Sequence, residues 1–590
     1  MPRLKNGQKM NIKSLVLRNF KGVGDTPQRI DFAPITLLFG PNSAGKSTIL
    51  HAFLYLNELL SNGNCSPENT EFGGDSIDLG GFFSLVHGHD LSKAIEISVE
   101  FSFDELEIPD YLSDYESDEL SDRGLPYTSE FFQDVNLAKI SLEIKWSNQH
   151  QKAYISTYSV FLDDGLICLI STKPETFEST LNLLEMDAMP FRTSMDEDTS
   201  FPSFNAMLSL LVSSRWSASR NDMAISGRPF SQDKVGYMRS LVADDEYYSY
   251  PLLLALKAEL SGYRNTPSAK AFEVEIDTLL MEMEESIANK ANVADMPLVR
   301  TSEGFLNFNR VLPIPGEFWD ESEEELVPFQ LYKRFAESVI TSAALGPAKC
   351  LSEWLKEYTY IGPIRQVPPR NYLPSLENKS KSWASGMAAW NQVVNLPEKK
   401  MELINYWMKD VLDTGYELFI RTFHEAESWA HEDKPDKAQV RKRVMFNRIM
   451  GDRLEVLPSD VGIGISQVFP VIVLSCIKEH GLAAIEQPEL HIHPKLQVEL
   501  ADLFIDAIRR SNSIFLLETH SEHLLLRFLR RIRENKGESS KFDKDSLAVI
   551  YAQSSSQGSE YTNLEITGDG DFVNEWPEGF FEERDGELFF

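Results

Sequence analysis

The sequence predicts an α/β fold with an antiparallel β lobe near its start and a helical insertion in its middle. Three observations support this prediction. A strand, a loop and a helix follow one another around residue 40, and buried strands return near residues 485 and 515. The runs between residues 95 and 162 alternate apolar and polar residues. Alternation with a period of two indicates strands, and apolar residues at helical spacing indicate helices.

Length and composition limit the class of protein. A chain of 590 residues is too long for one ordinary core and suggests roughly two to four domains. The hydrophobic share of 42% and the charged share of 25% are ordinary for folded globular protein. The sequence contains no run of about 18 apolar residues, so we expect no membrane span. The net charge of −33 opposes general binding to DNA or to an anionic membrane.

The start of the chain and its cysteines indicate a cellular setting. The first twenty residues carry charge but no apolar core with a cleavage site, so we expect no signal peptide. The four cysteines are far apart and form no CxxC pair. That spacing favours neither a zinc site nor a disulfide framework. We therefore expect a reduced, cytoplasmic protein.

The elements follow in order along four predicted domains. Short alternating runs give strands between residues 10 and 40, a helix begins at Ser47, and the runs at 95–103, 137–146 and 152–162 give the antiparallel lobe. The middle of the chain has helical periodicity without the sustained heptads of a long coiled coil. Further helices are expected around 388–425, before strands and helices alternate again at 444–535. The predicted domains are residues 1–200, 201–345, 346–535 and 536–590, of which the second is the helical insertion and the last holds short strands and an acidic tail.

The segment GPNSAGKST, which begins at Gly40, fits the phosphate-binding pattern G-x-x-x-x-G-K-[ST]. Gly40 and Gly45 allow the tight turn that wraps backbone N–H groups around a phosphate, and the following helix points its positive end at the same oxygens. Lys46 can reach the β- and γ-phosphates, and Ser47 can bind Mg²⁺. The residues expected to contact ATP in this loop are Gly40, Asn42, Gly45, Lys46, Ser47 and Thr48.

Two strand ends near the C-terminus supply further candidates. GLAAIEQPE is an apolar strand ending at Glu486, whose carboxylate can sit beside the Mg²⁺ that Ser47 holds. SIFLLETHSEHLL ends at Glu518, Thr519 and His520, and a histidine there can hydrogen-bond the γ-phosphate and report its presence. The alternative for His520 is a plain polar residue.

The segment SDVGIGISQVFPVIV combines small residues with the start of an apolar helix. Such a turn suits an anion, so Ser466 and Gln467 are candidate nucleotide-binding residues. The alternative is a helix cap with a flexible turn.

The order of these motifs resembles that of the ABC-type ATPases of the SMC-like and OLD-like group, and most of all the stand-alone bacterial OLD-like AAA family ATPases. The motifs in that order are LRNFKG, the phosphate loop, a long insertion, the small-residue turn, the strand ending at Glu486, PELHIHP and ETHSEH. The tail EWPEGFFEE is similar to the segment typical of one branch. The resemblance implies an ATPase head that dimerises on ATP, with Lys46 and Ser47 of one head facing Ser466 and Gln467 of the other.

Within this resemblance Gln487 stands where relatives carry a catalytic glutamate. Glutamine can orient a water molecule but cannot accept its proton, so the general-base role is lost. Glu489, two residues on, is a candidate substitute base. We therefore predict tight ATP binding with slow hydrolysis.

The resemblance also bears on the biological role. Many OLD-like proteins carry a Toprim nuclease after the ATPase, but too few residues follow His520 here, and Asp569 and Asp571 in GDGDF are expected to form a turn. We expect an ATPase that acts as sensor or regulator of a separate nuclease or toxin in anti-phage defence, as in Septu-type systems and some retrons. One alternative is a DNA-repair or chromosome-maintenance ATPase that clamps DNA with basic clusters at Lys434–Arg443 and Arg527–Arg533; another is an ATP-binding scaffold with negligible turnover.

Overall fold

The computed structural model describes residues 10–184, 296–300 and 327–574, with a few single residues besides. Gaps occur at 73–74, within 104–134, and at 164, 375–382, 426–438, 450–453 and 535–541. The chain divides into two compact units. Unit 1 comprises residues 1–8, 103–142 and 154–350, and unit 2 comprises residues 9–102, 143–153 and 351–590.

The alternating runs of the predicted β lobe form strands. They are β6 (Ile95–Phe103), β7 (Leu137–Ser147) and β8 (Lys152–Leu162). In unit 1, β8 pairs antiparallel with β9 (Gly165–Thr172), β9 with β10 (Glu178–Leu184), and β10 with β11 (Met296–Arg300). The antiparallel sheet expected from the alternation is therefore confirmed.

Most of residues 201–345, the predicted insertion, lies outside the described residues, so its helical character stays a prediction. Two described elements add detail. β11 is a strand inside this range. Helix α8 (Val327–Leu355) runs through position 345, where the sequence predicted the end of the insertion.

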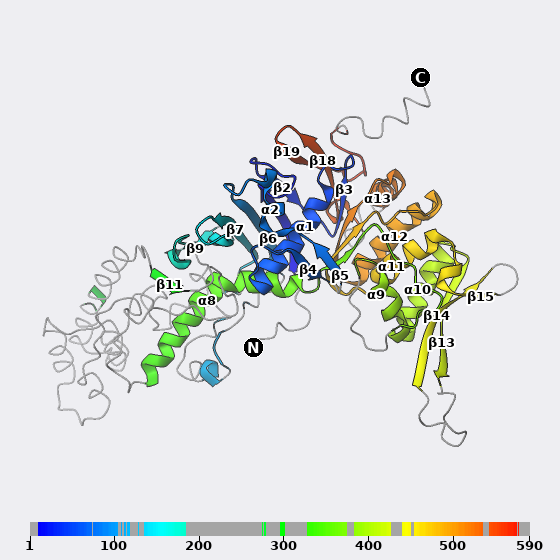
Figure 1. Cartoon of the computed structure of the whole chain (residues 1–590), viewed down its shortest axis with the longest axis horizontal. Helices are drawn as coiled ribbons and strands as arrows, with labels where there is room; N and C mark the ends of the chain where they lie inside the picture. Colours follow the sequence, from blue (N-terminus) through cyan, green and yellow to red (C-terminus); the bar gives the residue numbers. More distant parts are fainter. Residues whose placement is uncertain are drawn as a thin grey trace, which may run out of the picture. The chain divides into compact units, whose positions relative to one another are not determined.

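Unit 2 contains the sheet that carries the sequence motifs. Its strand order is β12-β16-β17-β3-β18-β19. The strands are β3 (Ile35–Phe39), β12 (Thr359–Ile361), β16 (His480–Glu486), β17 (Asn512–Glu518), β18 (Leu547–Ser555) and β19 (Gly558–Leu564). The first five strands in the order are parallel, and β19 is antiparallel to β18. In Figure 1, β3 and β18 lie side by side although they come from opposite ends of the chain.

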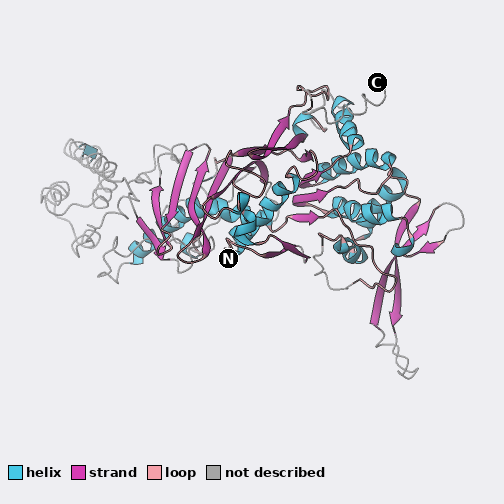
Figure 2. Cartoon of the chain, turned by 45° about the horizontal axis from the view of Figure 1, so that its top comes forward, coloured by secondary structure: helices cyan, strands magenta, loops and turns pink. Residues whose placement is uncertain are grey.

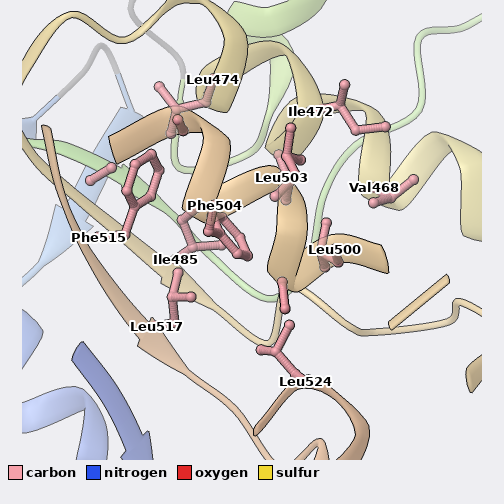
Figure 3. Close-up of a cluster of buried hydrophobic side chains, with 14 of the residues drawn as sticks. Val468, Ile472, Leu474, Ile485, Leu500, Leu503, Phe504, Phe515, Leu517 and Leu524 are labelled. Atoms are coloured by element: carbon pink, nitrogen blue, oxygen red, sulfur yellow. The ribbon is translucent and has the colours of Figure 1, made fainter. Parts of the chain in front are cut away.

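Helices bury their apolar faces against this sheet. They are α11 (Ile463–Ile477), α12 (Pro494–Arg510) and α13 (Glu522–Glu534). Figure 3 shows their side chains pointing toward those of β16 and β17, with Phe504 of α12 next to Phe515 of β17. β16 and β17 are apolar along nearly their whole length because parallel strands are covered on both faces. This core holds the carboxyl ends of the strands in place.

The N-terminal part of unit 2 leads into the phosphate loop. β1 (Met10–Arg18) and β2 (Gln28–Asp31) pair antiparallel. β3 is buried throughout and ends before Gly40. The loop then enters α1 (Lys46–Asn57), whose residues are buried on nearly all sides, as expected for a core helix.

The region from 388 to 425 is helical only in its first half. α9 (Met387–Gln392) and α10 (Glu398–Asn405) confirm the expected helices. Tyr416–Glu425 instead forms strand β13, which pairs antiparallel with β14 (Gln439–Arg448), as Figure 2 shows. The helical expectation was wrong for this stretch, because pairing with the next strand of the chain overrides the local pattern.

In the part of the chain that the structure describes, no helix is both long enough and apolar enough to cross a membrane.

Candidate active site

The phosphate loop has the predicted strand–loop–helix setting. Both of its glycines are favoured by their backbone conformation and by the lack of room for a side chain. Gly40 has φ 139° and Gly45 has φ 97°, both in the range that side chains disfavour. A Cβ at Gly40 would lie 2.1 Å from the carbonyl oxygen of Ala552, and one at Gly45 would lie 2.3 Å from Ser559 Oγ. Strands β18 and β19 therefore lie too close to the loop for a side chain at either position.

Lys46 lies folded against its own loop. Its Nζ donates to the carbonyl oxygens of Gly40 at 3.0 Å and Pro41 at 2.9 Å. Burial lowers the pKa of Lys46, although Glu518 and Glu486 act in the opposite direction. The ammonium group is thus held at the mouth of the loop by neutral acceptors, which a phosphate can replace.

Three further loop residues have the following positions. Asn42 is exposed. Thr48 is buried, and its N–H donates to the Gly45 carbonyl at 3.0 Å in the first turn of α1. Ser47 lies at the start of α1 with its hydroxyl on a carboxylate. Their contacts with ATP stay predictions.

Two glutamates lie side by side at the carboxyl ends of neighbouring strands. Glu486 of β16 is paired in register with Glu518 of β17, and Glu518 is paired with Leu38 of β3. Ser47 Oγ donates to Glu518 Oε2 at 2.8 Å, and Lys46 Nζ lies 3.8 Å from Glu518 Oε1. Glu518, to which the sequence assigned no role, thus contacts both functional side chains of the loop.

Glu486 was predicted to sit beside the Mg²⁺ that Ser47 holds, and its strand lies one position further from β3 than that of Glu518. Its Oε1 accepts a hydrogen bond from the Tyr360 hydroxyl at 2.7 Å. Burial, and then the neighbouring Glu518, raise the pKa of Glu486 to about 7. Burial, and then the charge of Glu486, also raise the pKa of Tyr360. Tyr360 belongs to the short edge strand β12, which no motif marks in the sequence.

Gln487 occupies a constrained turn directly after β16. Its φ is 45°, and its N–H donates to the Glu518 carbonyl at 2.7 Å. The buried guanidinium of Arg365 binds the carbonyl oxygens of Glu486 and Gln487, the second at 3.1 Å. Burial lowers the pKa of Arg365 to about 10, against the opposing charges of Glu489 and Glu486. Arg365 thereby holds the turn that positions the Gln487 amide.

Glu489 contacts the backbone next to the predicted γ-phosphate sensor. Its Oε1 accepts a hydrogen bond from the His520 N–H at 2.8 Å, and burial raises the pKa of Glu489. Burial, together with the charge of Lys46, lowers the pKa of His520. The imidazole is therefore neutral at physiological pH, and its buried Nε2 has no hydrogen-bond partner among the described residues.

Ser466 and Gln467 face the interior. Gln467 exchanges two hydrogen bonds with the backbone of Arg365, and Ser466 Oγ donates to the Pro458 carbonyl at 3.4 Å. The exposed residues at the start of α11 are Gly462 and Ile463, the latter 57% exposed. The predicted role of Ser466 and Gln467 at a partner's nucleotide stays a prediction.

The basic cluster on α13 is paired with acids. Arg527 binds Glu499 at 2.7 Å and Asp502 at 3.1 Å. Arg531 binds both oxygens of Asp502, and Arg533 binds Asp571 at 3.0 Å. These arginines are thus matched by carboxylates of the same chain. Of the other cluster, residues 434–438 lie outside the described residues.

The residues at the loop fit Mg²⁺. The ion prefers oxygen ligands and is commonly bound by one or two carboxylates together with substrate phosphates. Ser47, Glu518 and Glu486 supply such oxygens. Among the described residues, no group of three or more His, Cys, Asp or Glu side chains forms a metal site made of protein ligands alone.

Comparisons with known proteins place this site in a family. A model described as AAA ATPase domain matches residues 10–197 and 372–525, more than half of the chain. No curated protein matches. This chain is similar to several solved structures. One is an Smc head domain with an extended coiled coil, bound to the C-terminal domain of ScpA, from Pyrococcus furiosus. That likeness has 10% identity and a TM-score of 0.33, and it covers 94% of this chain and 96% of that one.

A second similar structure is the SMC head domain from Thermotoga maritima, with 9% identity and a TM-score of 0.33, covering 94% of this chain and all of that one. The family match includes β3 with its phosphate loop, the turn before α11, and both strands that end in glutamate. The chain has an α/β P-loop ATPase fold and belongs to the AAA ATPase domain family.

Proposed function

We propose that this chain is an ATP-operated switch, which binds ATP with Mg²⁺, hydrolyses it slowly, and joins a second copy in the ATP-bound state. The observation that carries the proposal is the constellation at the ends of β3, β16 and β17. In this constellation Lys46 and Ser47 both lie against the carboxylate of Glu518. Gln487 has an amide where a general base would be needed to remove the proton of the attacking water.

The binding half of the proposal rests on Lys46 and Ser47. Lys46 Nζ donates to two backbone carbonyl oxygens of the loop and carries the charge that phosphate oxygens require. The Ser47 hydroxyl already faces a carboxylate, as expected at an Mg²⁺ site. When bound, Mg²⁺ would neutralise charge on the β- and γ-phosphates.

The proposal of slow hydrolysis rests on how the side chains of Gln487 and Glu489 limit proton removal from water. The Gln487 amide can orient an attacking water but cannot take its proton. The Glu489 carboxylate accepts from the His520 N–H, so it acts through the histidine backbone. This arrangement supports a state that persists with ATP bound.

His520 supplies the sensor. A neutral imidazole can donate or accept one hydrogen bond at either ring nitrogen. Its buried Nε2, which has no hydrogen-bond partner among the described residues, and the influence of Lys46 on its pKa support this role. A γ-phosphate oxygen would satisfy this nitrogen, and its loss on hydrolysis would leave the ring without that bond.

The exposed turn at the start of α11 supports association of two copies. Ile463 is an exposed large apolar residue between Gly462 and Gly464. Sedimentation velocity with and without Mg²⁺ and ATPγS tests this. Wild-type protein should gain mass with ATPγS, and Ile463→Arg should not. Leu526→Arg, at another exposed apolar residue, on α13, is the matched control. Equal association by wild type and Ile463→Arg would place the contact elsewhere.

The output proposed for the switch is a separate nuclease or toxin in anti-phage defence, which follows the sequence resemblance. The four free, buried cysteines agree with a reducing cytoplasm. Co-expression with the genomic neighbours followed by phage challenge is the test. Lys46→Ala should abolish protection, and unchanged protection would contradict an ATP-dependent role.

The DNA-clamping alternative has less support, because the α13 arginines are occupied by Glu499, Asp502 and Asp571. Phosphate contacts would give binding that weakens steeply with salt. Duplex DNA binding that weakens steeply with salt would favour this alternative. If the protein does not bind duplex DNA even at low salt, the alternative is eliminated.

A further inference from the structure

Glu518 contacts the phosphate loop more closely than the glutamate that the motif order points to. Strand β17 lies between β16 and β3 in the sheet, so its end is the nearer one to the loop that follows β3. The register places Glu518 between Glu486 and Leu38. The side chain is 9% exposed, so its position is set by packing.

The contacts of the two glutamates differ. Glu518 accepts from Ser47 Oγ at 2.8 Å and lies 3.8 Å from Lys46 Nζ. Glu486 accepts from the Tyr360 hydroxyl, on the side of β12 and away from β3. The carboxylate that shares a partner with the predicted Mg²⁺ ligand is therefore that of Glu518.

The separation of the two oxygens suits a shared metal ion. Mg²⁺ holds oxygens at about 2.0–2.1 Å in near-ideal octahedral geometry, so neighbouring ligands are about 2.9 Å apart. Ser47 Oγ and Glu518 Oε2 are 2.8 Å apart. The pair can occupy neighbouring corners of an octahedron with little movement.

From this geometry we propose that Glu518 is the principal metal-site carboxylate, which with Ser47 holds the Mg²⁺ of bound MgATP. Glu486, tied to Tyr360, supports the ion from the second position. The metal-binding role that the motif order assigns to Glu486 is thus carried mainly by a glutamate of the adjacent strand. This inference rests on the proposed nucleotide site.

The test is binding of a fluorescent ATP analogue, mant-ATP, to the full chain with Mg²⁺ and with EDTA. Wild-type protein should bind more tightly with Mg²⁺. Glu518→Gln keeps the shape and an acceptor for Ser47, so it should fold, and the ratio of its affinity with Mg²⁺ to its affinity with EDTA should fall at least about tenfold. Glu398→Gln, an exposed position on α10, is the matched control.

A second readout is the EPR signal of free Mn²⁺ titrated into protein with ATP. Glu518→Gln should leave more Mn²⁺ free than wild type. An unchanged Mg²⁺ gain and an unchanged Mn²⁺ titration would overturn the role of Glu518 and leave the nucleotide site standing. Absence of mant-ATP binding by wild type, or unchanged binding by Lys46→Ala, would instead overturn the proposed function itself.

Discussion

The Glu489 carboxylate accepts a hydrogen bond from the backbone N–H of His520, 31 residues further along the chain, at 2.8 Å. This bond joins the turn after β16 to the turn after β17, on which the predicted γ-phosphate sensor lies. This contact favours a positioning role for Glu489, and the sequence suggests a substitute base.

Substitution at Glu489 distinguishes the two roles. Glu489→Gln keeps an oxygen that can accept from His520, so phosphate release should stay within a few fold of wild type. Glu489→Ala leaves a buried N–H unpaired, which costs about 1–3 kcal/mol, and should lower both turnover and melting temperature. If Glu489 were the general base, Glu489→Gln would lower phosphate release as much as Glu489→Ala.

Turnover should rise when the missing carboxylate is restored at position 487. A positioned general base contributes typically 10²- to 10⁴-fold, so Gln487→Glu should increase steady-state phosphate release by at least about tenfold. Gln149→Glu, at an exposed position in the turn between β7 and β8, is a matched charge control. Unchanged turnover in Gln487→Glu would show that this residue does not face the attacking water.

The raised pKa of Glu486 predicts a pH-dependent stability in metal-free, nucleotide-free protein. Burial and the adjacent Glu518 raise this pKa from 4.5 to about 7, so the folded protein holds the proton more tightly than the unfolded chain. The resulting stabilisation is complete below about pH 4.5 and is lost as the pH rises through about 7. Between about pH 5 and pH 8, wild type should lose up to roughly 3 kcal/mol relative to Glu486→Gln.

Melting temperatures of both proteins in EDTA across that range measure the difference. Curves that stay parallel would mean that Glu486 titrates normally.

Arg365 should be sensitive to a substitution that keeps its charge. Lysine cannot reproduce the planar fork that reaches the carbonyls of Gln467, Glu486 and Gln487, so Arg365→Lys should destabilise by roughly 2–3 kcal/mol and slow phosphate release. Arg370→Lys is the control, because its ion pair with Asp460 is largely exposed and contributes under about 1 kcal/mol. Thermal unfolding compares them, and equal melting temperatures would contradict the role of Arg365.

The part of the site that is local in sequence could be predicted, and the part that depends on strand order could not. Gly40 to Ser47 form the expected loop because strand, glycines and helix are consecutive. Glu518 was visible as a strand end, but its contact with Ser47 follows from β17 lying next to β3, which spacing along the chain does not reveal.

Side-chain direction was the second limit. Gln467 lies in the predicted turn, yet its amide faces Arg365, a residue that no sequence motif marks. Tyr360 comes from a three-residue edge strand without any pattern of its own. The β13–β14 pairing joins residues up to 32 positions apart, as in Tyr416 with Arg448, which local periodicity does not reveal.

The two neighbours of β3 have a consequence for synthesis of the protein. β3 is complete at Phe39, but β17 and β18, which flank it, begin at Asn512 and Leu547. During translation β3 therefore emerges with both of its edges unpaired. About 500 further residues must be added before both neighbouring strands exist, which takes roughly half a minute to two minutes. Such a long-range closure is slow to form and leaves an apolar strand exposed. The nascent chain is thus a substrate for chaperones until the last strands of the sheet emerge.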